Sequence, residues 1–109
     1  MAKNKLKKFN ELETFNHVVQ PSIDELRVGF NLKGNWRKNF FKNDNPIVLE
    51  LGCGKGEFTV GLAKSYPKKN FLGIDIKGAR IWAGASQALD EKLINVGFLR
   101  IRIDWIEMC

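Results

Sequence analysis

The sequence is poor in cysteine, and the two cysteines it has form no recognisable pattern. Among 109 residues these are Cys53 and Cys109, whose spacing matches neither a Cys-x-x-Cys motif nor a zinc site. A disulfide framework and a metal centre are therefore not expected, and we predict no metal ligand. The low thiol content fits a reducing compartment, so the cytoplasm is the expected location.

Long hydrophobic runs are also missing. No apolar run approaches the ~18 residues that suggest a transmembrane helix, and the N-terminus lacks the apolar core of a signal peptide. We therefore expect no membrane partner. The composition is otherwise ordinary, with 44% hydrophobic and 28% charged residues, and it suits one small folded domain. Nothing in the sequence indicates an oligomeric state.

The most informative segment is an apolar run followed by three glycines. Ile47–Leu51 predicts a buried parallel strand. Glu50 lies at its carboxyl end, where open α/β sheets bind their ligands. Gly52, Gly54 and Gly56 follow at alternate positions and predict a sharp turn whose backbone approaches a ligand closely.

The spacing of the glycines indicates which ligand is bound. The dinucleotide fingerprint G-x-G-x-x-G needs its third glycine where this chain has Glu57. A carboxylate at the start of the next helix opposes a pyrophosphate. S-adenosylmethionine has no phosphate, and its ammonium and ribose diol suit acids at strand ends. The pattern therefore favours S-adenosylmethionine over NAD, the alternative being a tight strand-to-helix turn in some other α/β protein.

A second strand-and-helix unit supports this interpretation. Residues 57–66 predict a helix that Pro67 ends, with Phe58, Leu62 and Tyr66 on one face. Asn70–Asp75 predicts a short strand that again ends in an acid. Asp75 follows the glycine turn at about the spacing at which an acid accepts hydrogen bonds from ribose hydroxyls. The alternative is a turn aspartate that binds nothing.

A third unit follows, and with it the predicted elements end. Residues 78–93 predict a helix, 96–101 a strand, and 102–104 a turn in which Asp104 caps a helix starting at Trp105. A doubly wound sheet usually has about five to seven strands. We therefore expect this chain to be the N-terminal part of a longer protein, truncated after about the third strand.

The residues before Pro46 have a different character. The net charge is +6, and the basic excess begins with Lys3, Lys5, Lys7 and Lys8. It returns in residues 33–42, where basic residues alternate with Trp36, Phe40 and Phe41. Such a mixture suits RNA phosphates and base stacking, although the aromatic residues are equally typical of a helix packed on the sheet. We predict a basic extension over 1–45, partly helical or flexible, and a cofactor-binding part over 46–109.

Taken together, these segments resemble the N-terminal half of the bacterial tRNA (guanine-N7-)-methyltransferases. The resemblance rests on residues 45–59 and 70–80, and on 33–41 and the Asn4-Lys5-Leu6 start, which are similar to Bacteroidetes-like members. It covers nearly the whole chain. It implies the Rossmann-like fold of the class I S-adenosylmethionine-dependent methyltransferases. The implied reaction transfers a methyl group to guanine N7 in the variable loop of tRNA.

The resemblance also implies roles for particular residues. Glu50 is then the cofactor-binding acid of the first motif, the three glycines lie under the methionine part, and Asp75 binds the ribose. The third contact is an Asp or Asn in the family, but this chain has Arg102 there. Arginine cannot accept a hydrogen bond from the adenine amino group. At this position the backbone amide of Ile103 is a candidate contact to the ring, and Asp104 is a candidate only if the turn is shifted.

No catalytic residue is identified in this chain. In the family, the acid implicated in catalysis and the Pro-Asp-Pro and basic motifs lie beyond the third strand. We therefore expect a tRNA partner for the family reaction but an inactive chain in isolation. Two alternatives stay open: a non-catalytic fragment that binds cofactor or RNA weakly, and a class I methyltransferase that acts on another substrate.

Overall fold

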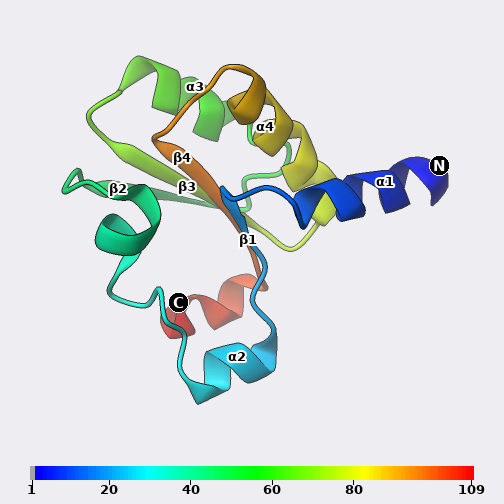
Figure 1. The fold of residues 1–109 in the computed structure, drawn as a ribbon, viewed down its shortest axis with the longest axis horizontal. Coiled ribbons are helices and arrows are strands. Elements are labelled where there is room, and N and C mark those ends of the chain that lie inside the picture. Colours follow the sequence, from blue (N-terminus) through cyan, green and yellow to red (C-terminus); the bar gives the residue numbers. More distant parts are fainter. Residues whose placement is uncertain (1) are drawn as a thin grey trace.

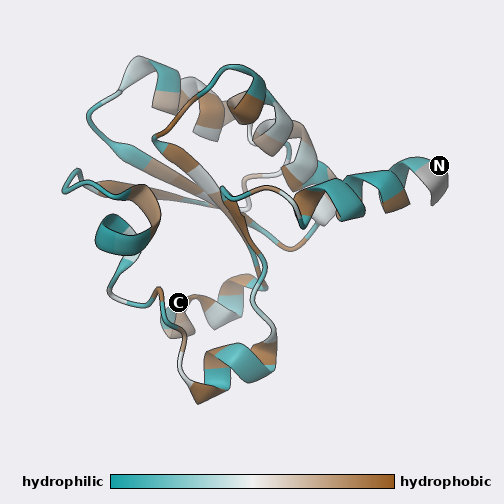
Figure 2. Ribbon diagram, in the orientation of Figure 1, coloured by the Kyte–Doolittle hydropathy of each residue, from teal (hydrophilic) through white to brown (hydrophobic). Residues whose placement is uncertain are grey.

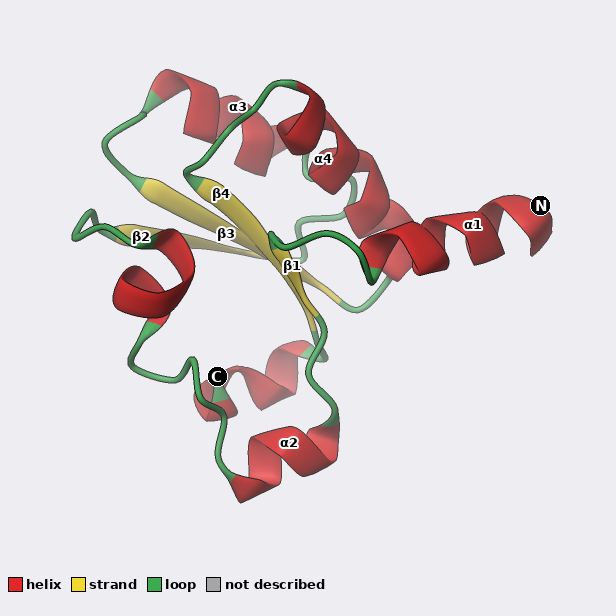
Figure 3. Cartoon of the chain, in the orientation of Figure 1, coloured by secondary structure: helices red, strands yellow, loops and turns green. Residues whose placement is uncertain are grey.

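The computed structural model describes residues 2–109, with side chains from Asn4 onward, as one parallel sheet covered on both faces (Figures 1 and 3). The Lys3 side chain, which belongs to the predicted basic excess, is not among the described side chains. The sheet has the order β1-β4-β3-β2, and its strands are β1 (Val18–Val19), β2 (Ile47–Leu51), β3 (Asn70–Asp75) and β4 (Val96–Arg100). The helices are α1 (Ala2–Leu12), α2 (Ile23–Val28), α3 (Glu57–Ser65), α4 (Gly78–Asp90), the π-helix η1 (Trp36–Phe41) and the 3-10 helix η2 (Ile103–Met108). The predicted Rossmann-like α/β fold is confirmed.

The two faces of the sheet carry separate apolar cores, because successive side chains of a strand point to opposite faces. On one face, α1, α3 and α4 cover β-strand residues such as Phe71 and Phe98. On the other face, residues of η1 and η2 pack over Leu72, Ile74 and Leu99. Figure 2 shows the hydrophobic residues concentrated in the sheet and on the inner sides of the helices, while α1 is largely hydrophilic.

The expectation that Ile47–Leu51 forms a buried strand is half wrong. The strand forms with the predicted bounds, but Val48, Leu49 and Leu51 are 38%, 48% and 53% exposed. The reason is position: β2 pairs only with β3 and forms one edge of the sheet. An apolar run predicts a strand with neighbours on both sides, and the sequence does not reveal that one side is open.

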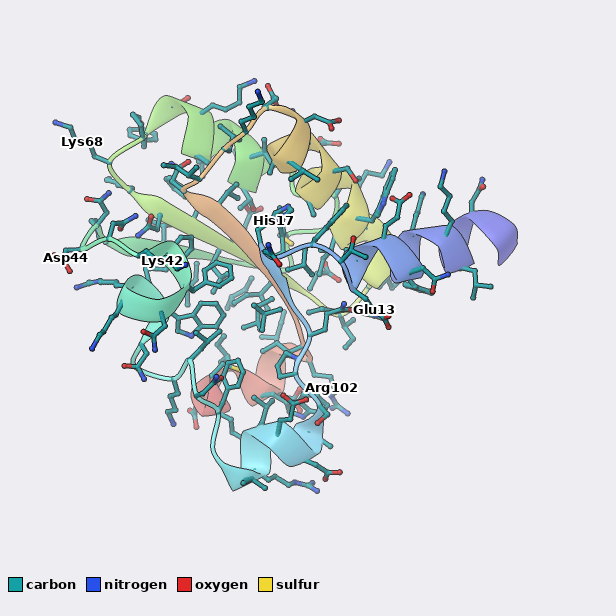
Figure 4. All side chains as sticks on the ribbon, in the orientation of Figure 1. Glu13, His17, Lys42, Asp44, Lys68 and Arg102 are labelled. Carbon is teal, nitrogen blue, oxygen red and sulfur yellow. The ribbon has the colours of Figure 1, made fainter. Side chains whose placement is uncertain are left out.

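The segment before Pro46 contributes to the sheet, which the sequence did not predict. Val18 and Val19 of β1 pair in parallel with Phe98 and Leu99 of β4 and add a fourth strand to the three expected. His17, labelled in Figure 4, donates from Nε2 to the Ala85 carbonyl of α4 across 2.7 Å, which is a structural role. The domain boundary at residue 46 remains a prediction, but 2–45 is more than a loose extension.

The C-terminal end of α1 is fixed to α4. Leu12 is fully buried, and Trp82 Nε1 of α4 donates to Glu11 Oε2 across 2.6 Å. The aromatic residues of η1 are also structural. Phe41 is buried and Trp36 and Phe40 pack against the same core, so the alternative that these rings belong to a packed helix is confirmed.

The inner face of α3 differs from the predicted one. Thr59, Val60 and Ala63 are buried, whereas Phe58 is 74% and Tyr66 50% exposed. Gly56, the N-cap residue before α3, lies very close to α4 and to Phe98. In the part of the chain that the structure describes, no helix is long and apolar enough to cross a membrane.

Candidate cofactor site

The glycine turn between β2 and α3 is built on left-handed backbone. Gly52, Gly54 and Gly56 have φ angles of +72°, +56° and +74°, which L-residues with side chains rarely adopt. The Ile74 carbonyl of β3 accepts from the amides of Gly52 and Cys53 across 2.7 and 2.9 Å. The turn is therefore fixed to the end of the neighbouring strand.

The three glycines serve two different purposes. A side chain at Gly52 or Gly54 would meet no atom within 4 Å, so the backbone there is open to a ligand. A Cβ at Gly56 would instead lie 2.8 Å from Phe98 Cε1 and 3.2 Å from Gly84 Cα. Gly56 thus permits close packing of α3, whereas the two earlier glycines keep the outer side of the turn clear.

The acids predicted to bind the cofactor lie on the same face of the sheet. Glu50 pairs in register with Gly73, and Asp75 follows two residues later. The pKa of the Cys53 thiol is raised to about 12. Burial is the largest cause, followed by the negative charges of Asp75 and of Glu50. Both carboxylates therefore create a negative potential at the turn, and Cys53 is a small buried residue rather than a reactive thiolate.

Hydrogen bonds hold each carboxylate in place. Asp75 accepts the Gly54 amide on Oδ2 and the Lys77 amide on Oδ1, each across 2.9 Å. Glu50 accepts the hydroxyl of Thr59 on Oε2 across 2.6 Å. Thr59 was missed by sequence reasoning, because nothing in the helix pattern distinguishes it from an ordinary buried threonine.

A hollow lies beside the predicted ribose acid. It has a volume of about 650 Å³, and its lining includes Ile76, Arg100 and Trp105 together with Val18 and Gln20 from the N-terminal segment. Arg100 is held there by bonds from Nε to the Ile76 carbonyl and from Nη1 to Gln20 Oε1, across 2.9 and 3.1 Å. Near Asp75 the hollow therefore offers apolar contacts from Ile76 and Trp105 and polar groups from Arg100 and Gln20.

Arg102 and Ile103 follow the carboxyl end of β4, at the start of η2, and Arg102 is labelled in Figure 4. Arg102 is exposed, and its Nε and Nη2 donate to the two carboxylate oxygens of Asp104, each across 3.1 Å. The prediction that Asp104 caps the last helix is wrong: it lies inside η2, and Arg102 occupies the cap position without a side-chain cap. Ile103 is 44% exposed.

The arrangement suits binding of an organic cation with hydroxyl groups. Two carboxylates flank a turn whose backbone is open, and among residues 2–109 no group of three or more His, Cys, Asp or Glu could hold a metal ion. Carboxylates accept hydrogen bonds from ammonium and hydroxyl groups. Four of the five turn amides, from Gly52 to Gly56, already have acceptors within the described part of the protein, and only that of Lys55 has none there. The site is thus built to bind and orient a ligand.

Comparison with known proteins agrees with this geometry. Residues 44–107 match a protein family described as "Putative methyltransferase". The chain is 63% identical over 107 residues to a tRNA (guanine-N(7)-)-methyltransferase of Christiangramia forsetii, covering 97% of this chain and 48% of the relative. It is 53% identical over 108 residues to the enzyme of that name from Bacteroides fragilis, covering 98% of this chain and 43% of the relative. The chain thus spans about half the length of these relatives.

Among solved structures, the chain is similar to PKMT2 from Rickettsia typhi in complex with AdoHcy. The match has a TM-score of 0.49 and 32% identity, and it covers 54% of this chain and 11% of that chain.

Proposed function

The chain belongs to the methyltransferase family that includes the bacterial tRNA (guanine-N7-)-methyltransferases, and from this we propose that it forms the S-adenosylmethionine-binding half of such an enzyme. The observation that carries the proposal is the placement of Glu50 and Asp75 on one face of the sheet, beside a glycine turn that is open at Gly52 and Gly54. This matches the chemistry of the methyl donor, which has a positive sulfonium, an ammonium and a ribose diol.

The proposed assignments follow the geometry. Asp75 receives the ribose hydroxyls; its two oxygens each have one backbone donor, and each carboxylate oxygen has a second lone pair to offer. Glu50 receives the ammonium. The amides of Gly52, Cys53, Gly54 and Gly56 already donate within the protein. The Lys55 amide is therefore assigned to the carboxylate of the methionine part. Gly56 packs against Phe98 and Gly84 and so fixes the end of the turn against the core.

The adenine ring is proposed to lie over Ile76, next to the hollow of about 650 Å³. Such a volume falls in the range of small-molecule sites, roughly 300–1,000 Å³. The Arg102 side chain is engaged by Asp104 and has no acceptor to offer. We therefore assign the edge contact to the Ile103 backbone and treat Arg102 as a neighbour of the ring.

The proposed reaction makes few chemical demands on these residues. When bound, S-adenosylmethionine supplies an electrophilic methyl group. Guanine N7 has an in-plane lone pair and is already nucleophilic, so no strong base is required. The contribution of Glu50, Asp75 and the turn is to fix one reactant in place, and alignment of two reactants supplies up to roughly 7–11 kcal/mol of barrier reduction.

The proposed RNA partner is tRNA, contacted through phosphates. Lys5 and Lys7 are exposed on α1, and Arg37 and Lys38 are exposed on η1, so two separate helices present positive charge to a polyanion. Base stacking on the η1 aromatics is not part of the proposal, because those rings pack against the sheet.

Calorimetric titration with S-adenosylhomocysteine tests the cofactor site. We expect micromolar binding by the chain, and its loss in Glu50→Ala and in Asp75→Ala. Asp90→Ala removes an exposed acid at the end of α4 and serves as the matched control, which should bind like the wild type. Unchanged affinity in both site variants would refute the assignment.

A methylation assay on unmodified tRNA tests the reaction. The relatives' residues beyond the matched half have no counterpart among these 109 residues, so we expect no turnover from this chain alone. Robust activity would contradict that expectation. Cofactor binding without any tRNA binding would favour a methyltransferase half for another substrate. Absence of both, with a molten spectrum, would favour a non-catalytic fragment, in keeping with the exposed apolar side chains of β2.

A further inference from the structure

The carboxylate of Glu50 is held from inside the protein by one side chain. Thr59 lies in the first turn of α3 and is only 1% exposed. Its Oγ1 donates to Glu50 Oε2 across 2.6 Å. That length is typical of a hydroxyl bonded to an ionised carboxylate, an interaction about twice as strong as one between neutral groups.

The hydroxyl of Thr59 has other possible partners and does not use them. A threonine in a helix often bonds to the carbonyl one turn earlier or caps the helix start. Here Gly56 is the N-cap residue of α3 and there is no side-chain cap. The hydroxyl of Thr59 donates across to Glu50 on β2 instead. The contact therefore joins the helix to the acid and selects one orientation of the Glu50 side chain.

The second oxygen of Glu50 faces outward. Among the described side chains, from Asn4 onward, no hydrogen bond is made to Oε1 of Glu50, and no buried side-chain nitrogen or oxygen lacks a partner. Oε1 must therefore be reachable from solvent. One oxygen of the carboxylate is thus bonded to Thr59, and the other is open to solvent at the carboxyl end of β2, the strand that leads into the glycine turn.

We propose that Thr59 is a positioning residue for the methyl donor: it holds Oε2 of Glu50 so that Oε1 meets the α-ammonium of the methionine part. The inference rests on the proposed function, since it assumes that the turn binds this cofactor. Without the hydroxyl, Glu50 keeps its charge but loses its fixed direction, and the ammonium loses a prepared acceptor.

Two ligands separate positioning from simple structural support. S-adenosylhomocysteine carries the α-ammonium, whereas 5′-methylthioadenosine keeps the adenine, ribose and sulfur but lacks the amino acid part. We expect Thr59→Val to bind S-adenosylhomocysteine about tenfold more weakly and 5′-methylthioadenosine with unchanged affinity. Thr59→Ser, which restores the hydroxyl, should recover most of the loss. Thr14→Val removes an exposed hydroxyl from the N-terminal segment and should behave like the wild type.

Retained binding of 5′-methylthioadenosine also shows that Thr59→Val is folded. The inference is overturned if the variant binds S-adenosylhomocysteine as tightly as the wild type, or if both ligands weaken equally, because Thr59 would then act only on the fold. A wild-type chain that binds neither ligand overturns the proposed function and this inference with it. A wild-type chain that binds both, with no difference in Thr59→Val, overturns the inference alone.

Discussion

Replacing Gly56 by alanine would place a methyl group 2.8 Å from Phe98 Cε1 and 3.2 Å from Gly84 Cα, on backbone with φ of +74°. The left-handed conformation costs a residue with a side chain ~1–2 kcal/mol, and crowding a packed core costs ~1–3 kcal/mol. Alanine recovers ~0.4–1 kcal/mol by restricting the unfolded chain. The expected loss is about 1–5 kcal/mol, a large part of the stability of a small domain.

Gly54→Ala is the matched comparison. It shares the left-handed backbone, with φ of +56°, but its methyl group would meet no atom within 4 Å. Only the backbone strain remains, so we expect a loss of about 1 kcal/mol or less. Urea unfolding followed by tryptophan fluorescence gives both values. Equal stability of the two variants would refute the division of the glycines into a packed one and two open ones. Gly54→Ala should nevertheless weaken S-adenosylhomocysteine, since the methyl group enters the open side of the turn.

Three further outcomes are expected. The pKa of the Cys53 thiol is about 12 in the folded chain and near 9 once the chain unfolds. Above pH 9 the unfolded chain therefore loses this proton and the folded chain does not, so the free energy of unfolding should fall as pH rises. Cys53→Ala should show a smaller fall between urea titrations at pH 8 and pH 10. Asn95 Nδ2 donates to the carbonyls of Ala63 and Lys69 across 2.9 and 3.0 Å, so Asn95→Ala should cost about 1–3 kcal/mol, and an unchanged urea midpoint would contradict this. The edge strand β2, with its exposed apolar side chains, should promote self-association of the chain in sedimentation. Leu49→Lys should reduce it, whereas Leu6→Lys, at a leucine 65% exposed on α1, should not.

The sequence predicted the repeating units well where a strand or turn has a strong local signal. The bounds of β3, the start of α4 and the glycine turn follow from apolar runs that end in acids or glycines. The two-residue strand β1 has no such signal, since Val18 and Val19 form a strand only because β4 lies beside them. Its existence depends on tertiary pairing.

The errors in burial have a similar origin. The pattern of hydrophobic residues places Phe58 with Leu62 and Tyr66 on one face of α3, but the face turned inward is that of Thr59, Val60 and Ala63, and Phe58 is 74% exposed. Within the candidate site, Glu50 and Asp75 are predicted from their positions at strand ends. Thr59 is not predicted from the sequence, because its proposed role depends on one hydrogen bond across two elements.

The edge position of β2 has a consequence for how the site behaves over time. This strand carries Glu50 and leads into the glycine turn, yet it is hydrogen-bonded on one side only. Local opening requires few bonds to break at such an edge, so amide hydrogens of β2 should exchange with solvent sooner than those of β3. A ligand held by Glu50 and the turn would slow that exchange, which makes hydrogen-exchange protection at β2 a direct report of occupancy.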